Sequence, residues 1–137
     1  MTHRQVDEIL RRLKRIAEDY LVANGYQVVT EDKKIFPYVE PALAALRDGR
    51  LLVFSIKEFP SASQFLRPEE LIHIRDDLKE FVEANTPDSD ARVSRVETVA
   101  LVMTPEEITV AAPVGDIKWL MVKQEDEVPD ALDKLSL

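Results

Sequence analysis

The sequence predicts an α/β fold in a single domain, and three observations support that prediction. Its 137 residues, 45% of them hydrophobic, suffice for one buried core but not for two ordinary ones. Segments whose apolar residues recur at helical spacing alternate with short apolar runs of the kind found in strands. The turn dipeptide Asp48-Gly49 separates two of these runs, as in a β-hairpin.

The first element is expected to be an amphipathic helix over residues 3–23. Gly25 follows Asn24 as a stop signal of the kind that ends helices. The bases between Arg11 and Arg15 each have an acid four residues away, so we interpret them as a salt-bridged solvent face. Residues 26–30 should follow as a short strand or an extended entry to the sheet. The apolar positions of the helix are Val6, Ile9, Leu10, Leu13, Ile16, Ala17, Tyr20 and Leu21.

The hairpin extends from Tyr38 to Lys57. Its turn should require a positive φ at Gly49. Pro41 is expected inside the first strand, where its missing backbone donor indicates a sheet edge or a bulge. The second strand ends on a cation, Lys57.

A second helix should begin at Arg67-Pro-Glu-Glu, because proline and acids favour the first helical turn. It should end near Asn85, before Pro87. Residues 96–103 form a short, apolar, β-branched run, which predicts a fully buried strand.

The remaining chain is less uniform. After residue 103, two alternatives stay open: a short helix starting at Thr104, or a hairpin strand across 108–112. Residues 117–122 predict a final strand. Residues 124–137 are acidic, and we expect them to form a loosely ordered tail.

Composition excludes several classes of site. Cysteine is absent and the only histidines are His3 and His73, which rules against disulfides and a zinc site rich in Cys or His. No apolar run approaches the roughly 18 residues of a membrane span, so a cytoplasmic protein without membrane contact is expected. The formal charge of -8 argues against broad binding to nucleic acid, and any contact with phosphates would have to be local.

The order of elements, the Gly25-Tyr26 pair after the first helix and the hairpin together resemble the PD-(D/E)xK nuclease superfamily, for example the archaeal Holliday junction resolvases. The likeness covers roughly residues 3–122. It implies a restriction endonuclease-like mixed central sheet flanked by helices, with a nuclease-like α/β domain over 1–123 and the acidic tail at 124–137. In that family an Asp on the first strand and a Glu-x-Lys on the second surround a divalent metal.

The resemblance also locates the site, and there the acids are missing. Counted from Gly49, the family positions of Asp, Glu and Lys hold Ala42, Ser55 and Lys57. Within a register error of one or two residues only Glu40 and Glu58 are acidic. Glu58 adjoins Lys57 and should therefore point to the opposite face of the sheet. One carboxylate, from Glu40, makes a poor magnesium site.

Two hypotheses follow. The favoured one is a non-catalytic binding, regulatory or scaffold subunit without a cofactor or metal, in a nucleic-acid-handling assembly or as a homodimer. Glu40, Ser55 and Lys57 would then mark a vestigial cleft. The plain structural interpretation of Lys57 is a solvated edge residue, or a lysine with its stem on the core and its head in water. The alternative is an active Mg²⁺-dependent nuclease with migrated carboxylates, in which Glu40 and an acid such as Glu18 or Asp19 join Lys57.

Overall fold

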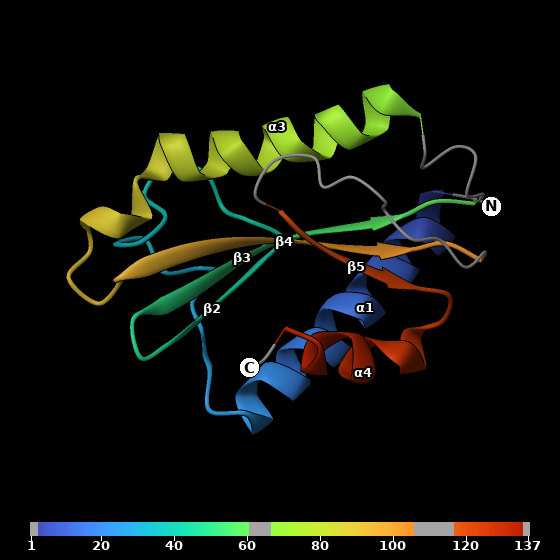
Figure 1. Ribbon diagram of the computed structural model, residues 1–137, viewed down its shortest axis with the longest axis horizontal. Coiled ribbons are helices and arrows are strands. Elements are labelled where there is room, and N and C mark those ends of the chain that lie inside the picture. The colour runs from blue at the N-terminus through green and yellow to red at the C-terminus, as the bar shows by residue number, and fades with distance from the viewer. Residues whose placement is uncertain (1–2, 61–66, 106–116, 136–137) are drawn as a thin grey trace.

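The computed structural model describes residues 3–60, 67–105 and 117–135, which form a single α/β domain around a five-stranded mixed sheet (Figure 1). In spatial order the strands are β1 (Gln27–Val28), β2 (Leu43–Arg47), β3 (Arg50–Glu58), β4 (Arg95–Met103) and β5 (Lys118–Val122). The pairs β1–β2 and β2–β3 are antiparallel, whereas the pairs β3–β4 and β4–β5 are parallel. The α/β class is confirmed.

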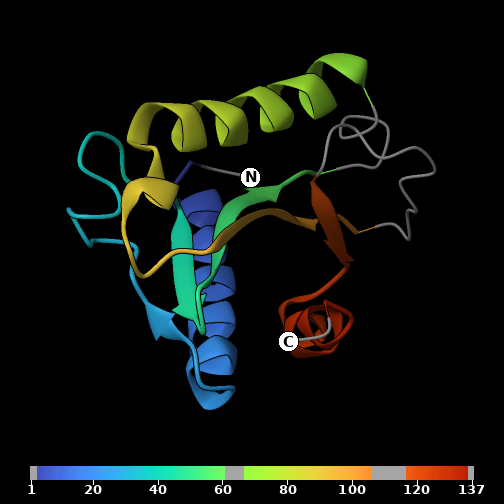
Figure 2. The same cartoon turned by 60° about the vertical axis from the view of Figure 1, so that its left-hand side comes forward.

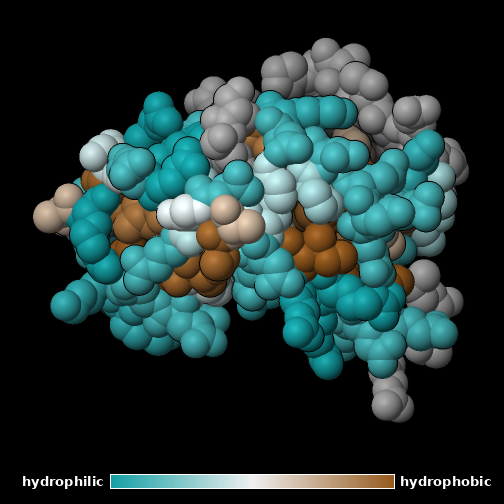
Figure 3. Space-filling model, turned by 90° about the horizontal axis from the view of Figure 1, so that it is seen from below, coloured by the Kyte–Doolittle hydropathy of each residue, from teal (hydrophilic) through white to brown (hydrophobic). Residues whose placement is uncertain are grey.

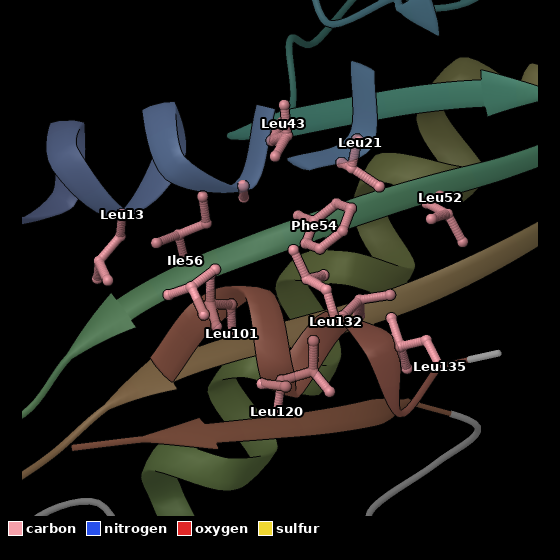
Figure 4. Close-up of a cluster of buried hydrophobic side chains, with 14 of the residues drawn as sticks. Leu13, Leu21, Leu43, Leu52, Phe54, Ile56, Leu101, Leu120, Leu132 and Leu135 are labelled. Carbon is pink, nitrogen blue, oxygen red and sulfur yellow. The ribbon is translucent and has the colours of Figure 1, made fainter. Parts of the chain in front are cut away.

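Helices cover both faces of the sheet. Figure 2 shows α3 (Pro68–Asn85) above the sheet, with α1 (His3–Ala23) and α4 (Val128–Asp133) side by side below it. Each face has its own hydrophobic core, and alternate residues of β3 serve the two cores. Figure 4 shows the core on the α1 and α4 side. Its labelled members are Leu13, Leu21, Leu43, Leu52, Phe54, Ile56, Leu101, Leu120, Leu132 and Leu135.

The alternation in β3 fixes where its polar residues lie. Leu52, Phe54 and Ile56 belong to the core under α1 and α4, whereas Leu51 and Val53 belong to the core under α3. Residues with even numbers therefore lie on the α1 and α4 face of β3, and residues with odd numbers lie on the α3 face. This places Arg50 and Lys57 at opposite ends of the strand and on opposite faces of the sheet.

The first helix ends as its sequence predicts. Gly25 has a φ of 86°, and its N–H donates to the carbonyl of Val22 at 3.1 Å. The N–H of Tyr26 donates to the carbonyl of Leu21 at 2.9 Å. These two bonds are those of a Schellman motif, in which glycine takes the left-handed position without a steric penalty.

The hairpin turn also agrees with its prediction. Asp48 and Gly49 have φ values of 50° and 81°, the two positive angles of a type I′ turn, between the paired Arg47 and Arg50. The carbonyl of Gly49 accepts hydrogen bonds from the N–H groups of Ser94 at 2.8 Å and Arg95 at 3.0 Å. The turn is therefore anchored to the beginning of β4.

The expectation for Pro41 is wrong. Strand β2 begins at Leu43, so Pro41 lies outside it, and β2 is an inner strand between β1 and β3. The chain after β1 continues alongside β2: the N–H of Val29 donates to the carbonyl of Ala44 at 2.8 Å, and the N–H of Ala44 donates to Oγ1 of Thr30 at 2.9 Å. The outer side of β2 is thus covered, and proline stands before the strand, where no ladder bond is lost.

The expectation of a loosely ordered tail is also wrong for residues 124–135. They form the 3-10 helix η2 (Glu125–Glu127) and α4, and the side chains of Val128, Leu132 and Leu135 are buried in the core. These three residues recur at helical spacing, a signal hidden among the acids. Polar contacts between the hydroxyl of Tyr20 and Asp133, and between Arg12 and Glu125 at 2.7 Å, also tie this segment to α1.

Other predicted elements are confirmed with small changes at their ends: the long first helix, the second helix ending at Asn85, and the strands β4 and β5. The alternatives for residues 106–112 lie outside the described part of the chain. None of the helices in the described segments is long and apolar enough to cross a membrane.

The face seen from below is mostly hydrophilic, with hydrophobic residues visible near its middle (Figure 3).

Candidate functional site

The positions singled out by the nuclease resemblance lie around the far end of β3. Ser55 and Lys57 lie on the α3 face of the sheet, where Lys57 is paired with the fully buried Val102 of β4. The last pair of β2 and β3 joins Leu43 to Phe54. Strand β2 begins at Leu43, so Ala42 is exposed just outside the sheet and is not paired with Ser55.

The acids considered for a metal site are not gathered at Lys57. Glu40 is exposed in the segment before β2, and its carboxylate lies 3.9 Å from Lys33 Nζ. Glu58 lies on the opposite face of β3, as predicted from its position next to Lys57. Glu18 and Asp19 belong to α1, which covers that same opposite face.

Lys57 is half-buried and forms no ion pair with any residue in 3–60, 67–105 or 117–135. Across those same ranges, no group of three or more His, Cys, Asp or Glu side chains is placed to hold a metal ion. Within the described residues, Lys57 is therefore a cation at the end of a strand, next to an apolar neighbouring strand.

A groove of about 620 Å³ is lined by residues of α3 and by Val39, and none of the sheet residues that the sequence indicated lines it. Its apolar part is formed by Val39, Phe81 and Ala84. The acids that line it are Asp77, Glu80 and Glu83. The helical members recur at spacings of three and four residues, so they form one stripe of α3 beside the stripe that faces the core.

The segment that borders this groove is held in a fixed conformation by Asn85, whose side chain is buried. The Asn85 side-chain oxygen accepts hydrogen bonds from the N–H groups of Tyr38 at 2.9 Å and Val39 at 3.1 Å. Its amide group donates to the carbonyls of Val39 and Phe81, both at 2.9 Å. All four capacities of the amide are used, because it accepts twice and donates twice. Yet Tyr38 is 80% exposed and Val39 is 42% exposed.

A separate charged cluster lies at the beginning of the parallel strands. The guanidinium of Arg50 contacts both carboxylate oxygens of Glu97, and Lys118 Nζ lies 2.7 Å from the same carboxylate. Hydrogen bonding from Arg50, aided by Lys118, lowers the pKa of Glu97 to about 2. The same hydrogen bond with Glu97 raises the pKa of Arg50. Glu97 therefore stays ionised at neutral pH.

Neither the groove nor this cluster was predicted from the sequence. The cluster had one local signal: Glu97 is an acid inside a strand whose other members are mostly apolar, and a half-buried carboxylate needs a partner. The groove had no local signal in the sequence. The buried side chain of Asn85 brings Tyr38 and Val39 to α3, and an asparagine is ordinary at the end of a helix.

Comparisons of the chain with protein-family models, with curated proteins and with solved structures find no match. The function must therefore be argued from the geometry of these surfaces.

Proposed function

We propose that this chain is a non-catalytic binding subunit on a nuclease-like frame, and that it binds a basic, amphipathic segment of a partner protein in the groove beside α3. The observation that carries the proposal is the pair Tyr38 and Val39. These exposed apolar side chains stand on a backbone fixed by a buried amide, next to an apolar groove.

The fixed backbone favours binding. Surface apolar residues on a loose loop would lose conformational freedom on association, whereas Tyr38 and Val39 are already held by the side chain of Asn85. Preorganisation of this kind lowers the entropic cost of forming an interface. Tyrosine is also among the residues enriched at the centres of protein interfaces, because it combines a large apolar ring with a polar tip.

The charge around the groove indicates the chemistry of the partner. Helix α3 carries six acids and only two bases, Arg75 and Lys79. Three of the acids line the groove. A partner segment with an apolar stripe flanked by Lys or Arg would fill the apolar part and meet the acidic part with opposite charge. This is why we propose a basic segment rather than an acidic one.

The site that the resemblance indicates also bears on the function. Counted from Gly49, Ala42 and Ser55 hold the positions at which the nucleases that the chain resembles carry metal-binding carboxylates, and Glu40 lies beside Lys33. This supports a role in binding rather than in hydrolysis, on a frame resembling that of the nucleases.

The proposal can be tested with a fluorescent, helix-forming peptide that carries Leu on one face and Lys on the other. We expect saturable binding by fluorescence anisotropy. A peptide with the same leucines but Glu in place of Lys should bind much more weakly, because its charge matches that of the groove. A Lys peptide with scrambled leucines tests whether charge alone is sufficient, and it should also bind weakly.

Matched variants locate the binding surface. Tyr38→Ser with Val39→Ser should weaken peptide binding at least about tenfold. Val22→Ser is the control, because Val22 is 58% exposed but lies on α1, under the opposite face of the sheet.

The acidic side of the groove has its own matched pair. Glu80→Gln with Glu83→Gln should weaken peptide binding and reduce its dependence on salt. The control is Glu69→Gln with Glu70→Gln, which removes the same charge from the first turn of α3 and should leave peptide binding nearly unchanged. Equal losses from both pairs would contradict the proposal, as would the absence of saturable binding. A concentration-dependent dimer in sedimentation that Tyr38→Ser abolishes would assign the groove to a second copy of the chain and overturn the proposed partner.

A further inference from the structure

We infer that a second pocket, at the beginning of β3, β4 and β5, binds a small phosphorylated anion. The pocket has a volume of about 580 Å³ and lies between these strand ends and the segment after α4. The only charged side chains among its described lining residues are four bases and one acid, which give a net charge of +3. They are Arg50, Arg95, Lys118, Lys134 and Glu97.

A structural ion pair would need only two of these groups. Arg50 alone occupies both oxygens of the Glu97 carboxylate, and the two side chains are 12% and 15% exposed. Lys118 adds a further contact at 2.7 Å. One carboxylate cannot neutralise the charge gathered around it, so an excess of positive charge remains in a concave site.

Arg50 is the anchor of this pocket rather than a free ligand group. Besides Glu97, its guanidinium donates to the hydroxyl of Tyr26 at 3.2 Å and to the carbonyl of Leu135 at 3.3 Å. Four of its five N–H donors are thereby used. It fixes the carboxylate and the segment after α4 in place.

The bases available to a ligand are the other three. The side chain of Arg95 is 65% exposed, and its Nε lies 3.6 Å from Glu97, beyond hydrogen-bonding distance. The side chain of Lys118 is 41% exposed, and Lys134 is also exposed. These three groups come from separate segments and converge on one pocket.

The ligand class follows from this arrangement. A phosphoryl group offers several charged acceptor oxygens, which suit converging Lys and Arg donors better than a single carboxylate does. The pocket volume is in the range of sites for small molecules. The chain as a whole carries a formal charge of -8, so a long polyanion would be repelled outside this patch, whereas a small anion would meet only the local field.

Isothermal titration calorimetry of the whole chain with pyrophosphate tests the inference, with sodium chloride added to the reference to match ionic strength. We expect a saturable one-to-one isotherm. Arg95→Gln with Lys118→Gln should weaken binding at least about tenfold. The control is Lys33→Gln with Lys79→Gln, which removes the same charge from side chains that are 73% and 69% exposed elsewhere.

Because Lys118 also contacts Glu97, the single variant Lys134→Gln tests the pocket without disturbing that carboxylate. It should weaken pyrophosphate binding about threefold or more while leaving thermal unfolding unchanged. Three results would overturn the inference: no saturable heat, equal losses in the Lys33 and Lys79 control, or binding of a single-stranded oligonucleotide but not of pyrophosphate. The peptide experiment on the α3 groove has no part in this outcome, so the two proposals fail independently.

Discussion

The two ends of β3 differ in how their cations are used. At its beginning, Arg50 is enclosed by Glu97, Tyr26 and the carbonyl of Leu135. At its far end, Lys57 lies beside the apolar Val102 and forms no ion pair within the described segments. The motif resemblance directs attention to the second end, but the charges that the fold brings together are at the first. A position in a motif thus says little about function until its neighbours in space are known.

The largest expected effect comes from removing Glu97. Glu97→Ala would leave Arg50 nearly buried without its partner, and we expect a loss of about 3–5 kcal/mol in the free energy of unfolding. Lys57→Met keeps the apolar stem and removes only the charge, so it should change the free energy by less than about 0.5 kcal/mol. Urea unfolding of both variants measures the difference. Similar losses in the two variants would mean that the two ends of β3 do not differ as described.

Acid provides a second test of the same contact. The folded-state pKa of Glu97, about 2, is below its ordinary value of 4.5. Its contribution to stability is therefore complete above about pH 4.5 and is lost as the pH falls through 2. The shift corresponds to at most about 3 kcal/mol. The difference in unfolding free energy between the wild type and Glu97→Gln should be large near neutral pH and should shrink steadily below about pH 4.5. A difference that does not depend on pH would show that the ionised carboxylate is not responsible.

The turn next to Arg50 gives a smaller effect. Gly49 has a φ of 81°, and a Cβ placed there would lie 2.5 Å from Ser94 Oγ. Gly49→Ala should therefore cost about 2–3 kcal/mol, from backbone strain together with this clash. Gly25 has a similar φ of 86°, but a Cβ placed there would lie 3.5 Å from Arg47, which is an ordinary contact. Gly25→Ala should therefore lower the free energy of unfolding by only about 1 kcal/mol. Thermal or urea unfolding of the two variants, compared side by side, separates strain from crowding. Equal costs would mean that the turn is not closely packed on β4.

Much of the fold could be predicted from local patterns. The helical spacing over residues 3–23, the Gly25 stop and the Asp48-Gly49 turn each report a backbone preference that acts within a few residues, and the structure agrees with all three. The errors arose where tertiary packing decided the outcome. Pro41 was misplaced because β2 begins only at Leu43 and is an inner strand. The segment 124–135 was misread because its acids outnumber its buried apolar residues, which are Val128, Ala131, Leu132 and Leu135.

The candidate sites could be predicted only in part. Ser55 and Lys57 share one face of β3, as expected for neighbours two residues apart in a strand. The cluster around Glu97 could not be predicted, because its members come from separate segments of the chain and meet only after the parallel strands have paired. The groove depended in the same way on a hydrogen-bonded contact between Asn85 and a segment 46 and 47 residues earlier.

A nuclear magnetic resonance titration of the ¹⁵N-labelled chain tests most directly whether this is a binding protein rather than a nuclease. The Leu and Lys peptide and Mg²⁺ are added to separate samples. We expect the peptide to shift the amide signals of Val39, Phe81 and Ala84, and Mg²⁺ to leave those of Ser55 and Lys57 unchanged. Shifts of Ser55 and Lys57 with Mg²⁺, together with cleavage of plasmid DNA that Lys57→Ala abolishes, would contradict the account.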